Sequence, residues 1–113
     1  MTLQWLLLSF EGRISRSAYW FAVAVITAAQ LAASLVDRLL FGPTTAPLSL
    51  LVWIAAIYPS LAVTAKRWHD RDKSAWWLLI GLVPLIGVVW TFVENGFLKG
   101  TSGPNRFGPD PLG

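Results

Sequence analysis

The sequence predicts an all-helical integral membrane protein with three transmembrane helices, a short interfacial segment before them and a turn-rich tail after them. Three stretches of the 113-residue chain carry no Asp, Glu, Lys or Arg: Ser17–Val36, Leu39–Ala65 and Ser74–Val93. Each can hold the roughly 20 apolar residues that a helix needs to cross a bilayer. The chain is also 55% apolar, with seven Trp, which is more apolar surface than a soluble chain of this size can cover. We therefore predict one membrane domain over residues 1–113.

The first ten residues predict a short segment that stays on the mature protein. The apolar run Leu3–Phe10 has no basic residue before it and leads to Glu11 and Arg13, not to a small-residue cleavage site. At about two helical turns it is too short to span a bilayer. Trp5 and Phe10 suit the headgroup region. An apolar terminus resting on the other helices explains the same residues equally well.

Two spans are delimited by charges and turn residues. The first covers residues 17–36 and ends at Asp37-Arg38. A segment with basic residues precedes it, and Tyr19 and Trp20 are aromatic residues suited to the membrane interface. The connector 41–47 is rich in Gly and Pro, which disfavour a helix. The second span covers residues 48–65. Both are predicted as single helices.

The third charge-free stretch, residues 74–93, allows two interpretations. Its ends carry Trp76-Trp77 and Trp90, as expected where a span meets the two interfaces. Its middle, Pro84–Gly87, predicts either a kink or the tip of a re-entrant hairpin. A helix over Ser74–Leu98 would be about 37 Å long, too short to cross a core of about 30 Å twice. We therefore predict one kinked span over 74–93 and a tail over 94–113.

The basic residues predict which side of the membrane the chain ends occupy. With three spans, six lie on one side (Arg13, Arg16, Lys66, Arg67, Arg71 and Lys73) and three on the other (Arg38, Lys99 and Arg106). The positive-inside rule then places the N-terminus in the cytoplasm and the tail outside. If the chain turns back at Pro84–Gly87, the count becomes eight to one and the tail joins the N-terminus.

The joint between residues 66 and 73 is the densest cluster of candidate functional residues. Six of its eight residues are charged, and it holds the only His. Basic anchoring of span ends explains most of it, but Arg67, His69 and Asp70 also suit contact with a headgroup phosphate or a partner. One His and no Cys do not make a multi-ligand metal site. We therefore predict no catalytic, cofactor-binding or metal-binding residue.

Two further segments supply candidate contact residues. Arg13 and Arg16 lie three residues apart with Trp20 four further on, so on a helix they share a face suited to phosphate oxygens. Plain anchoring at the interface explains them too. The tail has three Pro and two Gly in residues 103–111 and cannot be a helix. It is either disordered or folded back on the membrane surface, with Phe107 inserting and Arg106 pairing with a headgroup or an acidic side chain. Asn105 and Arg106 are its candidate contacts.

Three blocks of the sequence together resemble a known family. They are Phe10–Trp20, then Arg67-Trp68-His69-Asp70 with Ser74–Trp77, then Asn105–Pro111. In this order they are similar to the signature blocks of domain-of-unknown-function family 805, which comprises small bacterial inner-membrane proteins. The resemblance implies a multi-span helical protein in a bacterial cytoplasmic membrane. It draws attention to these residues without implying an activity.

Two classes of function remain open from the residues. The pattern favours a non-enzymatic membrane module whose basic cytoplasmic edge binds anionic lipid headgroups or a partner protein, or which forms homo-oligomers. Nucleic acid is not an expected partner, because the cations are scattered over segment ends. The alternative is a small oligomeric pore or transporter component. It is disfavoured because the predicted spans carry no Asp, Glu, Lys, Arg or His.

Overall fold

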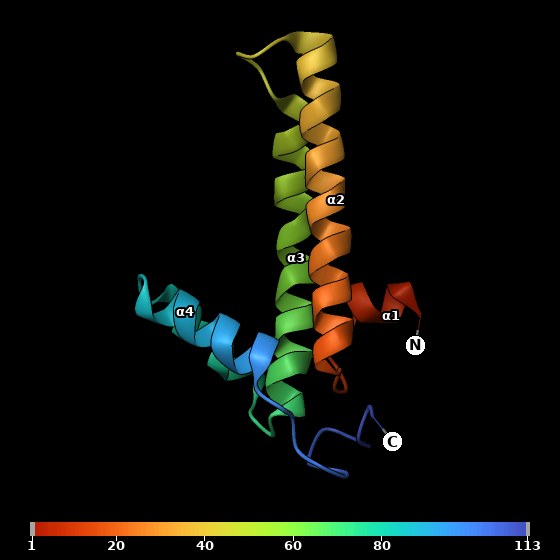
Figure 1. The fold of residues 1–113 in the computed structure, drawn as a ribbon, viewed down its shortest axis with the longest axis vertical. Coiled ribbons are helices and arrows are strands. Elements are labelled where there is room, and N and C mark those ends of the chain that lie inside the picture. The colour runs from red at the N-terminus through yellow and green to blue at the C-terminus, as the bar shows by residue number, and fades with distance from the viewer. Residues whose placement is uncertain (1, 113) are drawn as a thin grey trace.

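The computed structural model describes residues 2–112, and these residues form six helical elements and no β-sheet. Figure 1 shows two long helices, α2 (Arg16–Phe41) and α3 (Pro47–Asp70), lying side by side and antiparallel. We call the end of this pair where α2 begins and α3 ends the base. Short elements branch from the pair near the base, and both ends of the described chain lie there (Figure 1).

The first two predicted spans are confirmed as single helices, each running a few residues beyond the predicted limits. Ser15 caps α2 by accepting a hydrogen bond from the Ala18 amide at 3.3 Å. Gly42, with φ 75°, ends α2, and Pro47 begins α3 at a position that needs no amide donor. Asp37 then accepts hydrogen bonds from two amides in the first turn of α3.

Both long helices have the length and composition of membrane spans. Only 17% of the most apolar 18-residue window of each is buried inside the protein. A core helix of a soluble protein would instead have most of its apolar surface covered. The small buried side chains Ala22, Ala33 and Ala62 allow close approach of the two helices. The pair is therefore two candidate membrane-spanning helices.

The prediction of one kinked span over residues 74–93 is wrong. The chain instead forms the 3₁₀ helix η1 (Ala75–Leu82), reverses, and returns as α4 (Ile86–Phe92), which continues into the short π-helix η2 (Val93–Phe97). Pro84 interrupts the first arm, and Leu85 adopts φ 63° at the reversal. A Cβ on Gly87 would collide with the Ile80 carbonyl oxygen, so glycine permits the close approach of the two arms. We call Ala75–Phe92 the hairpin.

The N-terminal helix α1 (Leu3–Leu8) packs against the base. Leu6 is fully buried in a core that includes Tyr19 of α2 and Val63 of α3. Lys66 donates from Nζ to the Trp5 carbonyl at 2.7 Å and the Leu6 carbonyl at 2.5 Å. The Leu6 carbonyl thereby gains a partner at the end of the short helix, and the Trp5 carbonyl, which also accepts from the Ser9 amide, gains a second. The inner face of α1 therefore rests on the other helices, as one of the two interpretations predicts, while Leu3 and Leu8 are exposed.

Candidate functional site

A buried cluster of two arginines and one aspartate lies at the base. Asp70, in the last turn of α3, accepts from Arg13 Nε at 3.0 Å and also pairs with Arg67. All three side chains are at least nine-tenths buried. The carboxylate thus lies between two guanidinium groups and offsets part of their charge. We call these three residues the arginine–aspartate cluster.

The remaining guanidinium donors of the cluster hold backbone carbonyls. Arg13 donates to Thr101 O at 2.5 Å and to Gly103 O at 2.6 Å, both in the tail. Arg67 donates to three carbonyls, those of Ile14, Asn95 and Leu98, at 2.6–3.0 Å. Segments far apart in sequence are therefore fastened together by two side chains. Because these donors already have protein acceptors, the structure leaves neither arginine free to face a headgroup.

The turn-rich tail folds back onto the end of α3, and Phe107 contacts His69, whereas the sequence predicted its insertion into the membrane surface. His69 and Phe107 stack with ring centroids 4.0 Å apart and planes inclined by 5°. Asn105 donates from Nδ2 to the His69 carbonyl at 2.8 Å, and the Thr101 amide donates to the Asp70 carbonyl at 2.7 Å. His69 Nδ1 lies 2.8 Å from the Gly12 carbonyl oxygen. Since a carbonyl only accepts, Nδ1 carries the proton.

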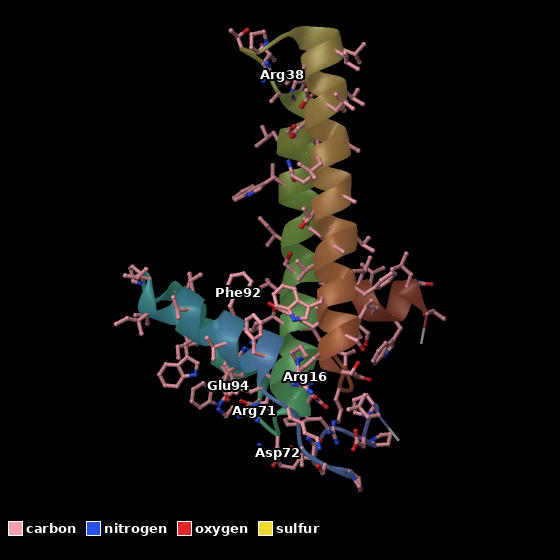
Figure 2. The ribbon with its side chains drawn as sticks, in the orientation of Figure 1. Arg16, Arg38, Arg71, Asp72, Phe92 and Glu94 are labelled. Carbon is pink, nitrogen blue, oxygen red and sulfur yellow. The ribbon has the colours of Figure 1, made fainter. Side chains whose placement is uncertain are left out.

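A second ionic group fastens the return arm of the hairpin. Glu94, in the first turn of η2, accepts from Lys73, from Trp90 Nε1 at 2.6 Å and from Arg71 at 3.4 Å. Figure 2 shows Glu94 beside Arg71 below the hairpin. Burial raises the pKa of Glu94, but the hydrogen bonds from Lys73 and Trp90, with the nearby positive charges, outweigh it and hold this pKa below its ordinary value.

Two further predicted residues on α2 donate hydrogen bonds to η2, and a third belongs to the apolar core. Trp20 donates from Nε1 to Gly96 O at 2.8 Å, and Arg16 donates to Phe97 O at 2.9 Å. A Cβ on Gly96 would lie 2.6 Å from the Trp20 ring, so glycine allows this contact. Tyr19 is 5% exposed and belongs to the apolar core. These α2 residues position η2 against the helix pair.

Five basic side chains at the base reach the surface. Arg106 pairs with Asp72 through Nε at 3.2 Å, but its side chain is 66% exposed. Lys99 is exposed, and its ammonium has no hydrogen bond or ion pair with any described residue. Arg16 is exposed, and Arg71 and Lys73 are about one-quarter exposed. Figure 2 places Arg16 and Arg71 at the base and Arg38 at the opposite end.

Some residues of the site were not predicted from the sequence. Glu94 follows directly on the apolar stretch, and this isolated charge was the available signal for a buried anchor. Gly100 lies so close to Asp70 that a Cβ would collide with the carboxylate. Asn95 is fully buried, and its side-chain amide has no hydrogen-bond partner among residues 2–112. Nothing in the sequence marks Gly100 or Asn95.

The base has exposed cations on its surface, and its buried carboxylates are paired with basic side chains. Within residues 2–112, no group of three or more His, Asp or Glu lies close enough together to hold a metal ion. The Asp70 carboxylate forms ion pairs with two arginines. The Glu94 carboxylate forms ion pairs with a lysine and an arginine and accepts a hydrogen bond from a tryptophan. The arrangement is suited to fastening helices together and to presenting cations outward.

Comparison with known proteins identifies the family. A family model described as "Protein of unknown function (DUF805)" matches residues 7–109. The chain belongs to this DUF805 family. It is 39% identical over 105 residues to inner membrane protein YhaH of Escherichia coli K12, covering 90% of this chain and 86% of that protein. It is 40% identical over 103 residues to inner membrane protein YhaI of the same organism, covering 90% and 85%.

A further relative is similarly covered. Uncharacterized protein YiiR of Escherichia coli K12 is 33% identical over 135 residues, covering 97% of this chain and 90% of the relative. No solved structure matches the chain. The three blocks noted in the sequence lie wholly or mainly within the matched family region, and in the structure they meet at the base. The chain is thus a DUF805 membrane protein, and the three blocks lie at its polar base.

Proposed function

We propose that this protein is a non-enzymatic, two-span module of the bacterial inner membrane that binds anionic lipid headgroups at its base. The observation that carries the proposal is the distribution of charge. Eight of the nine Lys and Arg lie at the base, and Arg38 alone lies at the other end of the helix pair. Positively charged segments next to membrane spans are attracted to anionic lipid by about 1 kcal/mol per residue.

The same distribution supports a cytoplasmic base. With two spans and the hairpin at the base, the count of basic residues is eight to one, and short flanking segments rich in Lys and Arg stay inside. Both chain ends then lie in the cytoplasm. This replaces the expectation of an external tail, which depended on a third crossing.

The proposal divides the predicted contact residues into two groups. Arg106, Arg16 and the newly recognised Lys99 are exposed and face headgroups. Arg13, Arg67 and Asp70 are buried and hold the tail and η2 in place, and His69 and Asn105 position the tail. Tyr19 and Trp20 position α2 against its neighbours. Headgroup binding therefore depends on the exposed cations, which the buried residues position.

Native mass spectrometry of the protein released from nanodiscs tests this function. The nanodiscs contain anionic and zwitterionic phospholipids, and the retained lipid masses are counted. The double variant Lys99→Gln, Arg106→Gln loses about 2 kcal/mol of attraction, so we expect about thirtyfold weaker retention of anionic lipid. Arg38→Gln, which removes one cation from the other end, is the matched control and should retain lipid like the wild type.

Three results would contradict the proposal. Equal retention by the double variant and the wild type would exclude the exposed cations as the binding site. Loss of lipid in Arg38→Gln would show an effect of overall charge only. A closed ring of several subunits without anionic lipid would favour the pore alternative, which at two spans per chain requires an oligomer to enclose a path.

A further inference from the structure

The hairpin is apolar on all sides and has little protein around it. No Asp, Glu, Lys or Arg occurs from Ser74 to Val93. Trp76, Leu82 and Leu85 are each 78% exposed, and both arms carry further exposed apolar side chains. An exposed apolar surface of this kind marks contact with a protein or a membrane. The hairpin therefore needs a covering medium that the chain itself does not supply.

The direction of the hairpin points to the membrane as that medium. Figure 1 shows it branching sideways from the base, with its tip pointing away from the helix pair and lying somewhat nearer than the base to the level of the middle of the pair. Its return arm is held there by Glu94 and by the hydrogen bonds from Arg16 and Trp20 to η2. The tip therefore extends outward from α2 and α3, away from the charged groups, which stay at the base.

The hairpin is too short to cross the bilayer. The eight residues of η1 span about 16 Å at 2.0 Å per residue, close to half of a hydrocarbon core about 30 Å thick. Part of the backbone at its tip also forms internal hydrogen bonds, as a lipid environment requires. The Gly87 amide donates to Val83 O at 2.9 Å, the Ile86 amide to Pro84 O at 2.7 Å, and Pro84 has no amide hydrogen to satisfy.

We propose that the hairpin inserts among the acyl chains of the leaflet on the side of the base and ends within that leaflet. Acyl chains suit the surface better than a partner protein, because apolar side chains are exposed on both arms and the surface continues onto the exposed faces of α2 and α3. A groove of about 500 Å³, lined by six apolar residues and Glu94, runs along α4 and η2 from Leu85 to Leu98 and offers apolar surface to an acyl chain. The inference goes beyond headgroup binding, since the hairpin itself carries no charged side chain.

Single cysteines test the insertion cleanly, because the chain has no Cys of its own. Leu82→Cys reports on the tip, Ser102→Cys on the tail at the base and Thr44→Cys on the connector at the far end. Each variant is reconstituted in vesicles and treated with a membrane-impermeant maleimide from either side. We expect the tip cysteine to react at least about tenfold more slowly than Ser102→Cys from the base side and than Thr44→Cys from the far side, because the hydrocarbon excludes water and reagent.

Depth measurement separates lipid from protein as the cover. A nitrobenzoxadiazole fluorophore on the tip cysteine should be quenched more strongly by nitroxides on the acyl chains than by nitroxides on headgroups. Fast labelling from the base side would place the hairpin in water, and fast labelling from the far side would show a crossing. Protection without quenching by acyl-chain nitroxides would show a protein cover. Each of these three results overturns the proposal.

Two features keep the test decisive. Val88→Cys, at an exposed position on the return arm, repeats it if Leu82→Cys fails to fold. The outcome is also distinguishable from failure of the headgroup proposal, which is measured as lipid retention on Lys99 and Arg106. A hairpin in the leaflet with no selectivity for anionic lipid would support the insertion and contradict only the headgroup function.

Discussion

At the scale of residues, the base is held together by charges that the protein neutralises internally. Asp70 pairs with Arg13 and Arg67, and each arginine uses its other donors on backbone carbonyls. Lys66, which anchoring at the interface would explain, is instead fully buried and completes the end of α1. Some of the basic residues that could have bound lipid headgroups thus join segments of the protein itself.

Removing the Asp70 charge should destabilise the whole base. In Asp70→Asn two buried guanidinium groups lose their counter-charge, and breaking a buried ion pair in this way costs about 3–5 kcal/mol. Asp72→Asn is the matched control, because its pair with Arg106 is exposed and such pairs contribute about 0–1 kcal/mol. The free energy of unfolding in micelles measures both. Similar small losses in the two variants would contradict a structural role for the cluster.

The sequence alone could select the residues of the site but could not assign their roles. Arg13, Arg67, His69 and Asp70 stand out by type and spacing. Whether a guanidinium group meets a lipid phosphate or a carbonyl depends on where the tail lies, and a segment rich in Pro and Gly has no periodicity from which its path can be predicted. The burial of the two arginines therefore became visible only with the fold.

At the scale of elements, the hairpin depends on close contact between its arms. Gly87→Ala places a methyl group against the Ile80 carbonyl and should destabilise the hairpin by about 1–3 kcal/mol. Gly81→Ala is the control on the other arm, since its Cβ would meet nothing nearer than Thr91 Oγ1 at 3.9 Å. Hydrogen–deuterium exchange of residues 80–92 should quicken only in Gly87→Ala. Equal exchange in the two variants would argue against the tight reversal.

The elements were predictable where length and composition allow one answer. Residues 17–36 and 48–65 are long apolar stretches with polar or turn-rich ends, and both lie in single helices. Residues 74–93 satisfy the composition of a span and of a hairpin alike. The length estimate excluded two full crossings of the bilayer. A hairpin that ends within one leaflet makes no full crossing, so the estimate did not exclude it. The count of basic residues, eight to one, was the sequence feature that favoured the reversal.

At the scale of the whole molecule, the structure is markedly asymmetric along the helix pair. One end holds only the short connector, with Asp37 capping α3. The base carries α1, the hairpin, the tail and all but one of the basic residues. A protein built in this way presents nearly all its charged chemistry to one side of the membrane. We infer that this side is the cytoplasm, with two crossings of the membrane and both chain ends inside.

Reporter fusions test whether the chain crosses the membrane twice and has its base in the cytoplasm. Green fluorescent protein and alkaline phosphatase are each fused after Gly113, and alkaline phosphatase is also inserted in the connector after Thr44. We predict a fluorescent C-terminal fusion, an inactive C-terminal phosphatase and an active phosphatase at the connector. An active phosphatase after Gly113, with no fluorescence from the matching fusion, would contradict two crossings with a cytoplasmic base.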